Sequence, residues 1–257
     1  ITFHIYIDSG TFVSASVDAL AKAFWCDRIA AFGGAVVVNR PLDMQAADLI
    51  AANYFEVVAA PDFEEGVLEK LAARKNLRIF KLPALARLGE LAGVPFLDVK
   101  SMADGGIILQ QSFVNRIRSA ADFIPAVATT KDGLTVSARK PTPQEADDLV
   151  FAWAVEAGVT SNSVIFAHNG ATVAIGTGEQ DRVGAVEQAI EKFSQKYTGE
   201  GTLEGAVMSS DGFFPFYDAV ETAAKAGIKA IVAPSGSLKD ADVVKRANEL
   251  GVALRHA

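Results

Sequence analysis

Several residue types are scarce in this sequence, and each shortage excludes a class of protein. The 257 residues include one cysteine, Cys26, which excludes an intrachain disulfide and a zinc site built from several cysteines. The three histidines, His4, His168 and His256, lie too far apart in sequence for a local metal motif. No run of 18 or more apolar residues occurs, and the N-terminus lacks the basic and apolar regions of a signal peptide. We therefore expect a cytoplasmic protein without a metal.

Basic residues are also too few for a nucleic-acid partner. The chain has 24 Lys and Arg against 31 Asp and Glu, a net charge of −7, so no basic excess exists to displace counterions from DNA, RNA or an anionic membrane. With 50% hydrophobic and 21% charged residues the composition is globular. The length allows one large domain or two smaller ones. The sequence does not begin with Met, so we expect it to be part of a longer or processed chain.

Apolar residues recur with helical and extended periods in alternation, which favours an α/β layered fold with crossover connections. Residues 82–104 are expected to be irregular, and a domain boundary is expected between residues 112 and 140, where polar residues and prolines gather. The predicted helices are 17–26, 43–52, 64–74, 143–157, 183–193, 218–226 and 239–250, and the predicted strands are 35–38, 57–60, 77–80, 105–111, 163–167, 172–175, 205–208 and 228–233.

Helix boundaries carry local signals. Thr142 followed by Pro143 and Glu145 is a capping box, because the Thr hydroxyl can accept from the third amide and the Glu can reach back. Gly158 ends that helix and is expected to adopt the left-handed cap conformation, as are Gly227 and Gly251 after later helices.

The segment IGTGEQDR (175–182) follows a strand and opens a helix. In one interpretation Gly176 and Gly178 let the backbone approach an anion at the helix N-terminus, and Arg182 binds a phosphate. In the other, the segment is a tight turn with Asp181 as N-cap and Arg182 in solvent. The spacing alone favours neither. The segment is neither a dinucleotide fingerprint nor a P-loop, since the third glycine and a Gly-Lys-Ser/Thr triplet are absent.

Two further segments carry candidate binding residues. In SSDGFFPFYD (209–218) the phenylalanines form either a core plug, the more frequent outcome, or an apolar slot for a flat ring that Asp211 or Asp218 orients. In PSGS (234–237) the backbone forms either an anion nest or a capped turn. Asn162, before a strand, either satisfies a turn or holds a substrate. The glycine pair at 33–34 indicates a bulge or a close backbone approach.

Together these segments resemble the transformylase portion of the AICAR transformylase/IMP cyclohydrolase family of purine biosynthesis. The resemblance covers about residues 15–257 and keeps the family's order. Six stretches carry it: AFGGAVVVNRPLD (31–43), EVVAAPDF (56–63), TSNSVIFAHNG (160–170), IGTGEQDR (175–182), SSDGFFPFYD (209–218) and APSGSLKD (233–240).

The resemblance implies two tandem cytidine-deaminase-like α/β domains without the zinc, which we expect at residues 1–125 and 126–257. It implies formyl transfer from the co-substrate 10-formyltetrahydrofolate to the amine of AICAR, giving FAICAR, at sites shared between two subunits of a homodimer. The expected partners are thus AICAR and the folate, with no nucleic acid and no membrane.

The resemblance also implies roles for individual residues. Arg182 is expected to hold the nucleotide phosphate, near the turn of Gly176 and Gly178, and Asn162, Asp218 and His4 are the expected catalytic residues. The expected AICAR and folate contacts are Phe32, Gly33, Glu56, Gly212, Phe213, Phe216, Ser235 and Gly236.

The sequence departs from the family pattern at its N-terminal end. A Lys-His pair is usual there, and Phe3 stands before His4 where the Lys is expected. Thr160 and Glu179 replace the Lys and Gln of many relatives, and the sequence stops before the family's Arg- and His-bearing tail. Because Phe cannot donate or accept a proton, we expect slow transfer by this chain. The alternative is a catalytically impaired relative that binds a purine-precursor nucleotide or acts as a dimerisation partner.

Overall fold

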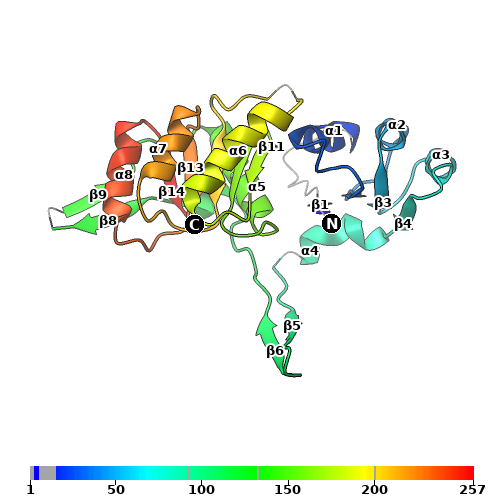
Figure 1. Ribbon diagram of the computed structural model, residues 1–257, viewed down its shortest axis with the longest axis horizontal. Coiled ribbons are helices and arrows are strands. Elements are labelled where there is room, and N and C mark those ends of the chain that lie inside the picture. Colours follow the sequence, from blue (N-terminus) through cyan, green and yellow to red (C-terminus); the bar gives the residue numbers. More distant parts are fainter. Residues whose placement is uncertain (1–2, 6–15, 92, 132, 200) are drawn as a thin grey trace.

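The computed structural model describes residues 3–5, 16–91, 93–131, 133–199 and 201–257, and it shows a mixed α/β chain with two main sheets (Figure 1). The first sheet has the parallel order β1 (Phe3–Ile5), β2 (Gly34–Val37), β3 (Phe55–Ala60), β4 (Arg78–Lys81). Its connections include α1 (Ser16–Cys26), α2 (Met44–Ala52) and α3 (Val67–Ala72). The core of this part contains Leu42, Ile50, Val58 and Leu71.

The second sheet is mixed and has six strands. Its order is β11 (Ala171–Gly176), β10 (Val164–His168), β12 (Val207–Ser210), β13 (Ala230–Ala233), β14 (Ala253–His256), β7 (Ile124–Pro125). β10 is antiparallel to both of its neighbours, β12 to β14 are parallel, and β7 is antiparallel to β14. The carboxyl ends of β11, β12 and β13 and the start of β10 therefore meet at one edge.

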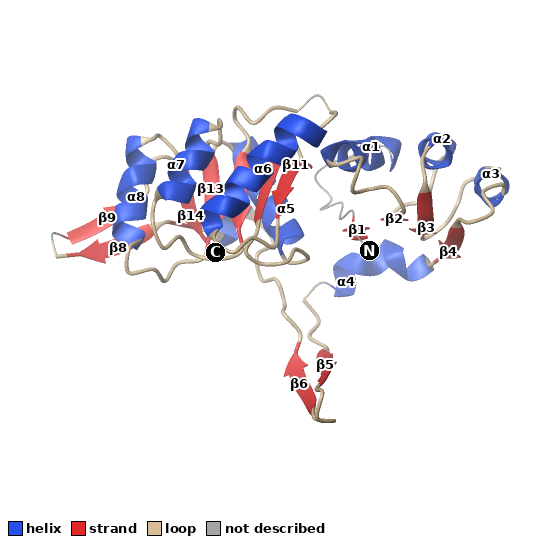
Figure 2. Cartoon of the chain, in the orientation of Figure 1, coloured by secondary structure: helices blue, strands red, loops and turns tan. Residues whose placement is uncertain are grey.

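Helices cover both faces of this sheet (Figure 2). α5 (Pro143–Glu156) packs through Leu149 against a face that includes Ile165. α6 (Arg182–Lys196), α7 (Asp218–Lys225) and α8 (Asp240–Glu249) pack on the face that includes Phe166. Adjacent residues of a strand point to opposite faces, so a strand buried on both sides has a continuous apolar run, as β10 does.

Two hairpins accompany the main sheets. β8 (Val127–Thr130) and β9 (Gly133–Val136) pack beside α8. β5 (Leu97–Ser101) and β6 (Ile107–Gln111) project from the rest of the chain, below the two main sheets in Figure 1. The remaining short elements are the 3-10 turns Pro83–Arg87 and Ala120–Asp122 and helix α4 (Leu88–Leu91). The expectation that residues 82–104 are irregular was wrong, since this stretch holds α4 and β5.

The two parts are joined through α1, which packs beside β11 of the second sheet. The Thr198 amide donates to the Trp25 carbonyl at 3.1 Å, and Lys196 pairs with Asp27 at 3.3 Å. Cys26 is buried here, and burial raises the pKa of its thiol to about 11. The thiol is therefore protonated and unreactive at neutral pH.

The predicted helix boundaries were largely confirmed. The Thr142 hydroxyl accepts from the Glu145 amide and the Glu145 carboxylate from the Thr142 amide. Gly227 and Gly251 have positive φ angles of 107° and 67°. The prediction for Gly158 was wrong, because its φ lies outside the left-handed region. Its amide donates to the Val155 carbonyl, three residues back, so the helix ends in a tighter turn.

Among the described residues, no helix is long and apolar enough to cross a bilayer.

Candidate functional site

The strand-end edge of the second sheet brings together most of the predicted site residues. Asn162 precedes β10, Gly178 and Arg182 follow β11, Gly212 to Phe216 follow β12, and Ser235 and Gly236 follow β13. Ligands of open α/β sheets commonly bind in the crevice outside the carboxyl ends of strands. We refer to this set of loops, residues 160–163, 177–182, 211–218 and 234–237, as the strand-end site.

Arg182 supplies the positive charge of the strand-end site, and its side chain is fixed by hydrogen bonds. It is the first residue of α6, and its side chain is 18% exposed. The guanidinium donates from Nη1 to Asp211 Oδ1 at 2.6 Å and from Nε to the Phe213 carbonyl at 3.0 Å. Asp181 caps the helix by accepting from the Gly184 amide at 2.7 Å. The expectation of an N-cap at Asp181 is confirmed, whereas an Arg182 lying in solvent is not observed.

Gly212 gives the Arg182 side chain its room. A Cβ atom at residue 212 would lie on the Arg182 guanidinium, so a larger residue would push the cation aside. Gly176 has a different role from the predicted one. A Cβ there would overlap the backbone oxygen of Ala185, which shows that Gly176 allows α6 to pack closely on β11 rather than a ligand to approach. Gly178 has a φ of 70° and open space around its Cα.

Asn162 holds the turn after β11 in place. Its backbone amide and its side-chain Nδ2 both donate to the Glu179 carbonyl, at 3.3 and 2.9 Å, and the Glu179 amide donates back to the Asn162 carbonyl. The Gly178 amide donates to the Thr160 carbonyl at 3.1 Å. Glu179 also accepts a hydrogen bond from Gln188 of α6. The bond to Glu179 uses the amide nitrogen of Asn162, so its oxygen Oδ1 is the atom that can accept from a ligand amine.

The phenylalanine segment is divided between core and surface. Phe214 is buried in the core, as a plug would be, whereas Phe213 and Phe216 are exposed beside the strand-end site. Asp218 begins α7, is exposed, and accepts from the Ala219 amide at 2.8 Å. The segment therefore offers two aromatic faces and one carboxylate to a ligand.

Ser235 and Gly236 form a capped turn. The amides of Gly236 and Ser237 donate to the carboxylate of Asp240, at 2.9 and 3.2 Å. Because Asp240 already occupies these donors, the anion-nest interpretation of this segment is not supported. Both Ser235 and Gly236 are exposed, and Gly236 lies against Phe213.

The remaining contacts expected for AICAR lie elsewhere, on the first sheet. Phe32 is 74% exposed and stacks on Tyr54 with 4.9 Å between ring centroids. Gly33 has a φ of 72°, its amide donates to the Tyr54 carbonyl, and Glu56 lies beside it. A hollow of about 350 Å³ opens next to Phe32, lined also by Lys196 and Thr198.

This second group is separated from Arg182 within the chain. Arg182 begins α6, whereas Lys196, beside the hollow of Phe32, ends it. A helix of 15 residues is about 20 Å long. One copy of the chain therefore does not bring Phe32, Gly33 and Glu56 to the strand-end site. His4 lies in β1, where its backbone pairs with Val36, and its side chain is outside the described part of the structure.

A buried carboxyl beneath the strand-end site was missed from the sequence. Glu156, at the end of α5, is 6% exposed and accepts from Ser163 Oγ at 2.5 Å. Burial raises the pKa of the Glu156 carboxyl from 4.5 to about 7, although the Ser163 bond opposes the rise. The sequence did contain a signal for this burial. Glu156 lies three residues after Trp153 and seven after Leu149, a helical spacing that places it on the apolar side of α5.

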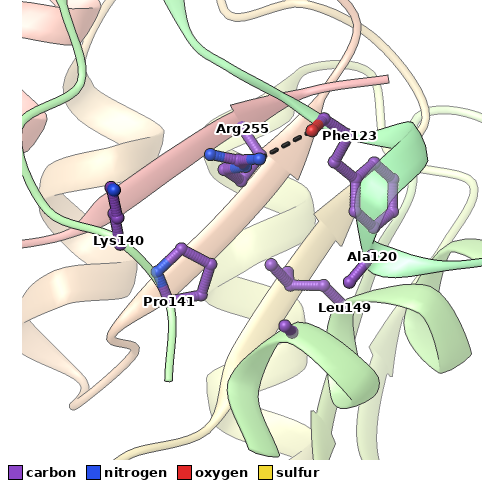
Figure 3. Close-up of a pocket in the computed structure, with 7 residues that line it drawn as sticks. Ala120, Phe123, Lys140, Pro141, Leu149 and Arg255 are labelled. Carbon is purple, nitrogen blue, oxygen red and sulfur yellow. Dashed lines mark hydrogen bonds between the residues drawn. The ribbon is translucent and has the colours of Figure 1, made fainter. Parts of the chain in front are cut away.

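A second hollow, of about 210 Å³, was also missed (Figure 3). It lies between α5 and β14 and is lined by apolar side chains together with Lys140 and Arg255. The Arg255 guanidinium donates to the Phe123 carbonyl at 2.6 Å, and burial lowers its pKa. Among the described residues, no group of three or more His, Cys, Asp and Glu side chains could hold a metal ion.

The fold and the strand-end site define the class of protein. It is a mixed α/β protein whose candidate ligand site lies at the carboxyl ends of strands β11, β12 and β13. The family model described as the AICARFT/IMPCHase bienzyme matches residues 9–192. The bifunctional purine biosynthesis protein PurH of Nostoc punctiforme is 40% identical over 244 residues, 95% of this chain and 43% of the relative. PurH of Caldicellulosiruptor bescii is 38% identical over 237 residues, 92% of this chain and 42% of the relative.

The chain thus belongs to the AICARFT/IMPCHase bienzyme family. It spans about two-fifths of the length of these relatives and corresponds to one portion of them. Among solved structures, the dCMP deaminase from the cyanophage S-TIM5 in apo form covers 45% of this chain and 99% of its own, at 17% identity and a TM-score of 0.30. A TM-score this low does not establish a shared fold.

Proposed function

We propose that the chain is the transformylase portion of its family and transfers a formyl group from 10-formyltetrahydrofolate to the amine of AICAR in the cytoplasm. The observation that carries this proposal is the setting of Arg182, a confined guanidinium at a helix start beside two exposed aromatic rings. A ribonucleotide with a flat base presents the matching groups, a phosphate for the guanidinium and a ring for Phe213 or Phe216.

The reaction needs positioning more than strong acid or base chemistry. The AICAR amine attacks the formyl carbon, a C–N bond forms, and the carbonyl becomes a tetrahedral oxyanion. The amine then gives up a proton, and the folate nitrogen leaves with a proton. Holding amine and formyl group together contributes about 7–11 kcal/mol at best. In this scheme Asn162 Oδ1 orients the amine, Asp218 contacts the substrates at the mouth of the site, and His4 takes the amine proton.

We further propose a homodimer in which each active site combines two copies. This arrangement accounts for the separation of Phe32, Gly33 and Glu56 from the strand-end site, since these residues would reach AICAR from the partner subunit. The two sheets would be tandem cytidine-deaminase-like units without zinc, at residues 1–125 and 126–257, with β7 crossing into the second sheet.

The hairpin of β5 and β6 supports a second copy as partner. Leu97, Val99, Ile107 and Leu109 share one face, as the cross-strand pairs Val99–Leu109 and Ser101–Ile107 require, and these side chains are 60–69% exposed. The opposite face is mostly polar, with Asp98, Lys100 and Gln110 beside the less exposed Ile108. An isolated hairpin is marginally stable in water, and an uncovered apolar face of this kind marks an interaction surface.

Replacing two residues of that face should separate the dimer. We expect Val99→Glu with Leu109→Glu to give a monomer that has lost most of its transferase activity, because charge on the apolar face opposes docking and each site lacks its second half. Sedimentation equilibrium at micromolar concentration measures the first effect, and tetrahydrofolate release measures the second. Leu68→Glu, an exposed apolar position of α3, is the control. A double variant that stays dimeric and active contradicts the proposed interface.

The phosphate role of Arg182 has its own test. We expect Arg182→Met to weaken AICAR binding by about 1.5–3 kcal/mol, the range for hydrogen bonds to charged groups. Calorimetric titration measures the affinity. Arg87→Met, which removes an exposed pair with Glu90, is the control and should bind as the unmodified chain does. Equal affinities for the unmodified and Arg182→Met chains would place the phosphate elsewhere, and an unmodified chain that neither binds AICAR nor releases tetrahydrofolate would contradict the proposed function.

A further inference from the structure

The buried carboxyl of Glu156 is connected to Arg182 through three contacts. Ser163 Oγ donates to Glu156 Oε1 at 2.5 Å, the Ser163 amide donates to Asp211 Oδ1 at 3.0 Å, and Asp211 Oδ1 accepts from Arg182 at 2.6 Å. Ser163 is fully buried, so the connection is shielded from solvent. Because the effective dielectric constant is lower there than in water, charges along this path influence one another more strongly.

The hydrogen bonds of this cluster are incomplete. Within the described part of the chain, neither Glu156 Oε2 nor the hydroxyl oxygen of Ser209 has a partner at hydrogen-bond geometry, and both atoms are buried, although the Ser209 hydroxyl lies close enough to Glu156 to lower the pKa of its carboxyl. A buried carboxylate is stable only when its oxygens accept enough hydrogen bonds or an opposite charge lies close by. The neutral acid needs fewer partners, because one oxygen carries the proton and can donate it. The cluster is therefore suited to a carboxyl that changes between its two states.

Two charged groups act on Glu156 from the elements packed against it. The negative charge of Asp211, after β12, favours the protonated acid, and the positive charge of Arg182, at the start of α6, favours the carboxylate. A phosphate bound at Arg182 would neutralise the cation and add negative charge. Both changes act in the same direction, toward the protonated acid.

We propose that anion binding at Arg182 is coupled to protonation of Glu156, which takes up a proton from solvent when a phosphate-bearing ligand occupies the strand-end site. Glu156 is then a positioning residue. In its neutral form it removes a repulsive charge from beneath the ligand and keeps the Ser163 bond that holds Asp211. The inference rests on the proposed role of Arg182 in phosphate binding and adds the protonation state that binding selects.

Proton uptake can be measured directly by calorimetry. AICAR is titrated at pH 7.5 in two buffers with different ionisation enthalpies, and the difference between the observed heats gives the number of protons exchanged. We expect the unmodified chain to take up about half a proton, since a group with a pKa near 7 is mostly ionised at this pH before binding. Glu156→Gln keeps the shape of the side chain but cannot titrate, and its binding should proceed without that uptake.

Glu65→Gln, at an exposed position before α3, is the matched control and should keep the uptake. No uptake by the unmodified chain, or equal uptake by the unmodified and Glu156→Gln chains, overturns the inference. If Glu156→Gln does not fold, Ser163→Ala replaces it and should reduce the uptake, because this variant removes the hydroxyl between Glu156 and the strand-end site. Equal uptake with Ser163→Ala also overturns the inference.

A second measurement does not depend on AICAR. Carbon-13 NMR of the Glu156 carboxyl from pH 5 to 9, with and without sulfate, follows the protonation of this group with an anion whose charge is constant over the range. We expect sulfate to raise the midpoint by about one pH unit, the size of a charge interaction across roughly 10 Å of protein. Absence of AICAR binding contradicts the proposed function alone, whereas a midpoint that sulfate leaves unchanged overturns the coupling.

Discussion

Gly176→Ala should destabilise the protein by about 3 kcal/mol or more. The added Cβ would overlap the Ala185 backbone oxygen, and a backbone atom of α6 cannot move aside as a flexible side chain can. Inserting atoms into a packed interior usually costs about 1–3 kcal/mol, and this site lies at the upper end because both β11 and α6 must shift. Urea unfolding followed by circular dichroism measures the loss.

Gly89→Ala is the matched control for that experiment. Gly89 lies in α4 with open space around its Cα and no unusual φ, so alanine should leave the free energy of unfolding unchanged or raise it by a few tenths of a kcal/mol. If Gly176→Ala unfolds at the same urea concentration as the unmodified chain, the close approach of α6 to β11 is not required for stability, and Gly176 regains its interpretation as a ligand contact.

The free energy of unfolding should decrease by about 3 kcal/mol between pH 4.5 and 7 because of Glu156 alone. In the folded protein burial raises the pKa of Glu156 from 4.5 to about 7, so within this window the folded state keeps a proton that the unfolded state has lost. Stability from this group is complete below pH 4.5 and is lost as the pH rises toward 7; each unit of difference in pKa corresponds to about 1.4 kcal/mol.

Comparison with Glu156→Gln isolates this contribution from the other titrating groups. Urea unfolding of both proteins at half-unit steps from pH 4.5 to 8 should show that the unmodified chain loses stability relative to the variant across the window and runs parallel to it above pH 7.5. Parallel curves over the whole range would mean that Glu156 ionises normally, and a relative gain with rising pH would mean that its pKa is lowered.

Local signals in the sequence predicted local structure well. The capping box at Thr142 was found, and of the two interpretations of residues 175–182 the N-cap at Asp181 was found. Each signal depends on hydrogen bonds or backbone angles within a few residues, so the local structure can be predicted from it without knowledge of the tertiary fold. Gly158 was the exception, because a glycine after a helix permits the left-handed conformation without requiring it.

The candidate site was predictable only in part, because its residues are related through distant segments. The sequence indicated Arg182 but not its bond to Asp211, which joins the loops after β11 and β12, two strands that flank β10 in the sheet and are separated along the chain. It grouped Phe32 and Glu56 with Arg182, although the structure places them near opposite ends of α6. Glu156 was overlooked because its position falls on the apolar side of α5, which predicts burial, whereas its charge predicts exposure. Only the structure shows that the side chain is buried.

The position of α1 beside β11 has a consequence for how the chain acquires its structure. Residues 27–170 are synthesised between α1 and β11. In the same way, strands β10 to β13 are synthesised between β7 and its partner β14. At both edges of the second sheet, a segment that is synthesised early, α1 or β7, contacts a strand that is synthesised much later. Contacts of such long sequence separation form slowly, since a large loop must close before any contact is gained. α1 therefore cannot complete its packing until β11 has been synthesised, and β7 cannot pair until β14 has been synthesised.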